Sequence, residues 1–193
     1  MEHSRWNIEV NESLISLEEA KFIFSQAEKR LADTLETSTG IAGKTTQLIT
    51  LLSALLVGII SYTFNELGNN DFTPSKIIIS LLSAIVVFGI SIYAIRNFLP
   101  SQYFVLGSAP KQLFVQDFYT EEIKKEDKTE LYMYMSEIEN YQYRIEQNEK
   151  TNEKRWQRFI NSVYALLVAP LILIILYFLI DSTFSVIQNY CSL

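Results

Sequence analysis

The sequence predicts an all-α membrane protein with three transmembrane helices, an amphipathic N-terminal helix and a long cytoplasmic helix that continues into the third span. Three runs of about 20 residues contain no charged side chain: 45–65, 77–95 and 159–180. At about 1.5 Å of rise per residue, a helix of that length crosses a hydrocarbon core of about 30 Å. The charged residues are concentrated between these runs, whereas a soluble helical protein distributes its apolar residues at helical intervals.

The basic residues beside the runs predict the orientation. Lys76 is the only cation in the short loop between the first two runs, whereas Lys44, Arg96 and a basic group before the third run flank the opposite ends. Basic residues favour the cytoplasmic side, so we expect a multi-pass protein of the bacterial inner membrane with a cytoplasmic N-terminus and an external C-terminus. The expected segments are a cytoplasmic N-terminal helix (1–44), a transmembrane hairpin (45–99), a cytoplasmic connector and coiled-coil-like helix (100–158), a third transmembrane helix (159–181) and an external tail (182–193).

An amphipathic helix is expected before the first run. Ser16 and Glu19 form a capping-box pattern, in which each side chain satisfies a backbone N–H of the first turn. Apolar residues follow at intervals of three and four, which places them on one helical face: Leu17, Ala20, Phe24, Ala27, Leu31 and Leu35. Gly40 predicts a break between this helix and the first span.

The connector that follows Pro100 is expected to be non-helical at first. Tyr103–Leu106 (YFVL) favours a short extended piece, and Ser108–Pro110 is typical of a helix start. A seven-residue pattern then continues into the third span, as in a coiled-coil seam: Leu131, Tyr134, Ile138, Tyr141, Ile145, Asn148, Asn152, Arg155 and Phe159. The pattern predicts one helix of about 40 residues that rises from the cytoplasm and crosses the membrane.

Four residues of this pattern are candidates for an oligomer seam or gate: Tyr141, Ile145, Asn148 and Asn152. A polar residue at a seam lowers stability but fixes register and oligomeric state. Two interpretations of the asparagines stay open. Either they form a polar ring or hydrogen-bonded clamp at the mouth of an assembly, or the seam rotates here and they face water.

The start and the middle of the third span carry two further features. Arg155, Trp156 and Arg158 are expected to anchor the span to anionic lipid headgroups. Pro170 predicts a kink that leaves a backbone carbonyl without its helical partner.

Composition argues against several classes of function. The net charge of −6 disfavours nucleic acid as a partner. His3 and Cys191 are the only histidine and cysteine, which excludes an internal disulfide and multi-His or multi-Cys metal sites. The three runs contain no ionisable group of the kind that proton relays and coupled transporters use. We expect no catalytic residues, no metal and no cofactor, and therefore no enzyme.

The chain resembles a known type of bacterial protein. The segment AEKRLADTLETSTGIAGKT, the tight hairpin, the G-x-x-P element at Gly107–Pro110 and the polar helix YQYRIEQNEKTNEKR are similar to those of small SLATT proteins and of transmembrane effectors in cyclic-nucleotide anti-phage systems. The third span distinguishes this chain from the two-span members. The resemblance implies a homo-oligomeric effector that permeabilises or depolarises the membrane when a soluble sensor protein or a nucleotide second messenger triggers it.

Two other functions are compatible with the same sequence. A non-conducting scaffold or adaptor would use the spans only as an anchor, and an accessory subunit would act inside a larger membrane complex. In each case membrane lipid is an expected partner.

Overall fold

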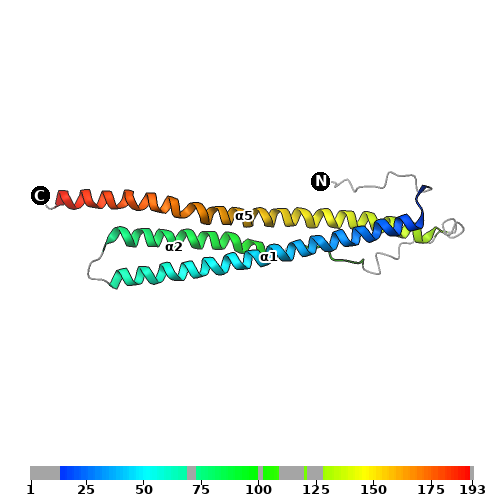
Figure 1. Ribbon diagram of the computed structural model, residues 1–193, viewed down its shortest axis with the longest axis horizontal. Helices are drawn as coiled ribbons and strands as arrows, with labels where there is room; N and C mark the ends of the chain where they lie inside the picture. Colours follow the sequence, from blue (N-terminus) through cyan, green and yellow to red (C-terminus); the bar gives the residue numbers. More distant parts are fainter. Residues whose placement is uncertain (1–13, 69–72, 100–101, 109–119, 121–127, 192–193) are drawn as a thin grey trace. The chain divides into compact units, whose positions relative to one another are not determined.

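The computed structural model describes residues 14–68, 73–99, 102–108, 120 and 128–191, and every regular element in this part of the chain is helical. The helices are α1 (Leu17–Gly68), α2 (Pro74–Ile95), the 3-10 helix η2 (Arg96–Phe98) and α5 (Thr129–Cys191) (Figure 1). Three of the helical stretches are long and apolar enough to cross a membrane: Leu17–Gly68, Pro74–Phe98 and Thr129–Ile187. The predicted all-helical class with three candidate spans is therefore confirmed.

The chain forms two compact units. Unit 1 consists of Met1–Gly40 and Ser101–Lys154, and unit 2 consists of Ile41–Pro100 and Arg155–Leu193. Most of the charged residues belong to unit 1, whereas the three uncharged runs belong to unit 2. Both α1 and α5 contribute residues to each unit.

Unit 1 begins with the capping box that the sequence predicts. The backbone N–H and the hydroxyl of Ser16 donate to Glu19 Oε2 at 2.8 and 2.7 Å, and the Glu19 N–H donates to Ser16 Oγ at 3.2 Å. These bonds satisfy backbone groups that have no partner inside the helix. Helix α1 accordingly begins at Leu17.

Two apolar clusters join the first part of α1 to the first part of α5 within unit 1. One is built on the buried residues Leu31, Tyr141 and Ile145, with Phe24 and Ala27 packed against them. The other is built on Ala20, Leu131 and Met135. The apolar stripe of the N-terminal helix and the seven-residue pattern of α5 therefore pack against each other inside one chain.

Helix α1 passes through Gly40 without interruption, so the predicted break is wrong. A glycine inside a helix costs only about 1 kcal/mol relative to alanine. Buried residues lie on both sides of it, Leu31 and Thr34 before and Ile41 and Thr45 after. The packing of these residues outweighs the local preference of glycine.

Unit 2 places an apolar core between polar contacts. Its core consists of Leu48 and Leu52 of α1 and Val87, Ile90 and Ala94 of α2, and α5 packs against it through Phe159, Val163, Leu166 and Ala169. Figure 1 shows these parts of the three helices running side by side. The spans are thus held together mainly by close packing, as is usual for helices in lipid.

Polar side chains join the helices of unit 2 on either side of this core. Thr63 and Ser80 share a hydrogen bond of 2.9 Å, and the Ser75 hydroxyl donates to Asp181 Oδ1 at 2.9 Å. Towards the other end of the core, Asn97 Nδ2 donates to Thr45 Oγ1 at 3.4 Å. Such bonds between membrane helices contribute about 0.6 kcal/mol each on average.

Helix α5 continues through Pro170 and ends at Cys191. Its 63 residues make one helix of the predicted continuous kind. The first ten residues of the segment expected as an external tail, 182–191, are part of this helix. The helix start predicted at Ser108–Pro110 lies largely outside the described residues.

We expect the first turn of α1 to lose protection in acid. Hydrogen bonds from the backbone N–H and then the hydroxyl of Ser16 lower the pKa of Glu19 below its ordinary value of 4.5. A depressed pKa stabilises the fold above the unfolded value, and this contribution is lost as the pH falls below about 4.5 through the lowered folded value. Amide hydrogen exchange at Glu19 between pH 6 and pH 3 measures the effect. The control is Glu19→Gln, which keeps an acceptor oxygen and has no titration in this range, so pH-dependent protection in that variant would contradict the assignment.

Candidate functional site

A set of polar contacts in unit 1 fixes residues 102–108, which we call the strap, against one face of α5. The α5 side chains that hold it recur at intervals of three and four, so they lie on one side of the helix. They are Glu137, Tyr141, Arg144, Asn148 and Asn152.

Asn148 holds the backbone of the strap. Its Oδ1 accepts the N–H of Phe104 at 3.0 Å, and its Nδ2 donates to the carbonyl of the same residue at 2.9 Å. A neighbouring β-strand exchanges the same pair of bonds with one extended residue. Phe104 must therefore present its N–H and C=O to the same side, which is the extended geometry that the sequence predicts at Tyr103–Leu106.

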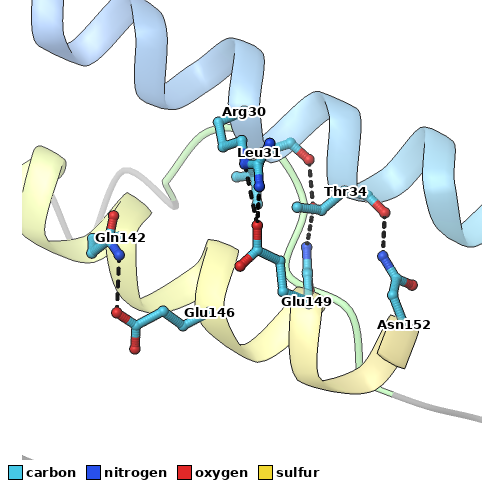
Figure 2. Close-up of polar contacts among 8 residues, drawn as sticks. Arg30, Leu31, Thr34, Gln142, Glu146, Glu149 and Asn152 are labelled. Atoms are coloured by element: carbon cyan, nitrogen blue, oxygen red, sulfur yellow. Dashed lines mark hydrogen bonds and ion pairs between the residues drawn. The ribbon is translucent and has the colours of Figure 1, made fainter. Parts of the chain in front are cut away.

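Asn148 and Asn152 also tie α5 to Thr34 of α1. Asn148 Nδ2 donates to Thr34 Oγ1 at 3.0 Å, and Asn152 Nδ2 donates to the Thr34 carbonyl at 2.7 Å; Figure 2 shows the Asn152 side chain pointing to Thr34. The Oδ1 atom of Asn152 accepts the hydroxyl of Tyr103 at 2.8 Å. In both asparagines the amide nitrogen reaches α1, and the oxygen receives a group of the strap.

Ion pairs on the surface of unit 1 support the same helix pairing. Arg30 and Glu149 approach to 2.6 Å next to the Thr34 contacts (Figure 2), and Lys21 and Glu130 approach to 2.8 Å. These side chains are largely exposed, so each pair contributes at most about 1 kcal/mol. These ion pairs therefore help to select one register of α1 against α5 but add little to the free energy of unfolding of unit 1.

The second attachment of the strap is at Gly107. Its N–H donates to the Tyr141 hydroxyl at 2.9 Å, and its carbonyl accepts from Arg144 Nη1 at 2.7 Å. Gly107 has a φ of +77°, in the left-handed region that residues with a Cβ avoid. Ser108 follows, and its hydroxyl donates to Glu137 Oε2 at 2.6 Å while accepting from Arg144 Nη2 at 2.8 Å.

Between these two attachments, the strap exposes its apolar side chains. Val105 is 65% exposed and Leu106 is 47% exposed. Phe104 makes an edge-on contact with Tyr143, with ring centroids 5.7 Å apart. The strap is consequently held mainly by hydrogen bonds rather than by burial in the apolar clusters of unit 1.

The environment of Tyr141 keeps its hydroxyl protonated. Burial raises the pKa of Tyr141 above its ordinary value, while the Gly107 N–H opposes this rise and the Glu28 carboxylate adds to it. The protonated hydroxyl donates to Glu28 Oε1 at 3.4 Å and accepts from Gly107. Tyr141 thus joins α1, α5 and the strap without carrying a charge.

The residues predicted from the sequence divide between the two units. Tyr141, Ile145, Asn148 and Asn152 come together in unit 1, and each of them is at least 94% buried. The interpretation that the asparagines face water is therefore wrong, because Thr34 and the strap cover them within one chain. The seam that the structure shows for these four residues lies inside the chain, and a polar ring between copies stays a prediction.

Arg155, Trp156, Arg158 and Pro170 belong to unit 2. Arg155 is only 7% exposed, as its seam position implies, so little of its side chain is available to lipid headgroups. Trp156 is 39% exposed and stacks on Phe159, and the Lys44 ammonium lies 4.8 Å from its ring centre. An exposed tryptophan beside a cation is typical of the membrane interface, and anchoring through Trp156 stays a prediction.

The strap itself was not identified from the sequence. The sequence predicts a short extended piece at Tyr103–Leu106, a G-x-x-P element at Gly107–Pro110 and a helix start at Ser108, but no attachment of these residues to the long helix. One signal was present: a glycine inside an apolar YFVLG run marks a backbone position that needs positive φ. The sequence gives no corresponding signal for Thr34, the α1 partner of Asn148 and Asn152, because threonine is common within helices.

Among the described residues, no three or more His, Cys, Asp or Glu side chains gather in a group that could hold a metal ion. Fold and site together define an all-helical protein with three candidate membrane spans and a separate helical unit that clamps its own connector. Comparison of the chain with protein-family models, with curated proteins and with solved structures finds no match.

Replacing Asn148 should destabilise unit 1 specifically. Asn148→Leu removes the hydrogen bonds to the Phe104 N–H and C=O and to the Thr34 hydroxyl, and each lost bond costs about 0.5–1.5 kcal/mol. We expect the opening free energy of amides in residues 24–34 and 138–148 to fall by about 2–4 kcal/mol in hydrogen exchange. The matched control is Asn161→Leu, since Asn161 is an exposed asparagine on the same helix. This substitution should change the opening free energy of the same amides by less than about 0.5 kcal/mol. Equal effects of the two substitutions would show that the Asn148 contacts contribute nothing particular.

Proposed function

We propose that the chain is an oligomeric effector of the bacterial inner membrane that permeabilises or depolarises the membrane on activation, in defence against phage. The observation that carries the proposal is the exposure of the third span. In the most apolar 18-residue window of α5, no residue is buried inside the chain. A helix of this kind needs lipid or another protein chain over most of its surface.

The exposed side chains of this span are open to contact with lipid or with further copies. Large apolar residues cover successive turns at more than half exposure: Leu167, Leu171, Ile175 and Phe178. Helices in a membrane associate through the packing of such surfaces rather than through the hydrophobic effect. An oligomer in which α5 contacts neighbouring copies would supply the packing that the single chain lacks.

The packing of unit 2 supports a resting state that does not conduct. The apolar core of Leu48, Leu52, Val87 and Ile90 lies between polar contacts at Thr45 and at Thr63. A dry apolar layer of this kind blocks the passage of ions. Activation would therefore require a rearrangement of the spans.

A groove around Pro170 supports such a rearrangement. It has a volume of about 560 Å³ and is lined by α1, α2 and α5, including Leu55, Val86 and Leu173. Because the helices leave this space between them, α5 has room to shift against the hairpin. Pro170 also removes one backbone hydrogen bond of α5 at this level, which lowers the cost of bending there.

Charge and resemblance complete the proposal. Lys44, Arg96 and Arg158 lie at one end of the uncharged runs, which favours a cytoplasmic position for unit 1 under the positive-inside rule. The resemblance to SLATT proteins and cyclic-nucleotide effectors favours a defence role. A soluble sensor protein or a nucleotide second messenger would then provide the trigger.

Depolarisation of infected cells tests the proposal. In cells that express the chain with its genomic neighbours, phage infection should collapse the signal of a potential-sensitive dye before lysis. The control carries three unrelated transmembrane helices in place of residues 45–65, 77–95 and 159–180. An effector loses depolarisation in this control, whereas an adaptor keeps its protection against phage. An unchanged dye signal in infected cells with full expression of the natural chain would contradict the proposal.

A further inference from the structure

We propose that the face of α5 that carries Tyr141, Arg144, Asn148 and Asn152 is a peptide-binding site, that the strap is its resting occupant, and that release of the strap is the regulated step of the chain. The site itself follows from the contacts of unit 1. Its role in regulation rests on the proposed membrane function.

The site recognises backbone as well as side chains. It engages both the N–H and the C=O of Phe104 through Asn148. It engages both backbone groups of Gly107, through Tyr141 and Arg144. Proteins that bind extended peptides use main-chain bonds of this kind for affinity and side-chain contacts for selectivity.

The side-chain contacts define the peptide that fits. The hydroxyl of Tyr103, the residue before Phe104, donates a hydrogen bond to Asn152. The hydroxyl of Ser108, the residue after Gly107, donates a hydrogen bond to Glu137. The positive φ of Gly107 favours glycine at that position. Val105 and Leu106 are exposed and contribute little. The occupant is therefore an extended segment of the form Tyr-Phe-x-x-Gly-Ser, which this chain or a second copy of it supplies.

The site is preorganised without its occupant. Neither apolar cluster that joins α1 to α5 contains a strap residue. Thr34 holds the amide nitrogens of Asn148 and Asn152, which leaves their oxygens directed to the strap. Departure of the strap therefore removes hydrogen bonds, including the one that Gly107 donates to Tyr141, but takes no apolar side chain out of these clusters, which is what a releasable strap requires.

A second copy offers an identical strap. An exchange of the same element between copies replaces each contact by its equivalent and is a low-cost route to an oligomer. The proposed effector is oligomeric, so exchange of straps would couple release to assembly.

Peptide binding in trans tests the site. The full chain is purified in detergent with the strap weakened by Tyr103→Phe, Gly107→Ala and Ser108→Ala, none of which alters α5 or α1. A Cβ at Gly107 meets no atom within 4 Å, so this substitution acts through the backbone alone. A fluorescent peptide of residues 102–108 should bind this variant at least ten-fold more tightly than the natural chain, whose own strap occupies the site.

Two modified peptides separate backbone recognition from unspecific adhesion. A methyl group on the Phe104 amide nitrogen removes the hydrogen bond to Asn148 and should weaken binding at least ten-fold. Replacement of the exposed Val105 by alanine should leave binding unchanged within two-fold. If the variant keeps natural helix content and a single elution peak but does not bind the peptide, or binds the N-methylated peptide equally well, the site is disproved.

The dye assay separates this inference from the proposed function. A strap-weakened chain that depolarises uninfected cells at equal expression supports release as the regulated step. If that variant still needs infection to depolarise the membrane, regulation by the strap is wrong. If peptide binding behaves as expected but the natural chain never depolarises infected cells, the proposed function fails and the peptide-binding site stands.

Discussion

The amides of Asn148 and Asn152 are the interaction on which unit 1 depends. Each lies at a seam position of α5, donates through its nitrogen to Thr34 of α1 and accepts through its oxygen from the strap. A buried amide is costly unless all its groups are bonded, so these contacts specify one register of α1 against α5. The apolar clusters alone would tolerate a shift by one turn, because similar residues recur along both helices.

Unit 2 follows a different constraint. A backbone in lipid has no water to satisfy its N–H and C=O groups, so continuous helices are the available solution. The hydroxyls in these helices mostly bond to a carbonyl of the preceding turn, as Thr50 does to Thr46 and Ser91 to Val87. They are therefore compatible with an apolar surrounding and do not imply a water path.

In the proposed function, the two units divide recognition from action on the membrane. In unit 1 the strap is held mainly by part-buried hydrogen bonds, whose partners water can replace. Unit 2 is held by packing, and its third span has few contacts inside the chain. Contacts that water replaces are suited to release, and a loosely packed span is suited to assembly with other copies. The continuous helices α1 and α5 contribute residues to both units.

The sequence by itself determined the helices. Uncharged runs of about 20 residues require lipid, a capping box starts α1, and the repeat from Leu131 to Phe159 gives α5 a buried face. These are local properties, because helical hydrogen bonds join neighbours four residues apart.

Only the tertiary structure decided what covers the buried face of α5. Asn148 pairs with Phe104 and Thr34, which lie 44 and 114 residues away along the chain, and no periodicity records such a partner. The same packing kept α1 continuous at Gly40, because buried residues on both sides outweigh the local preference of one glycine.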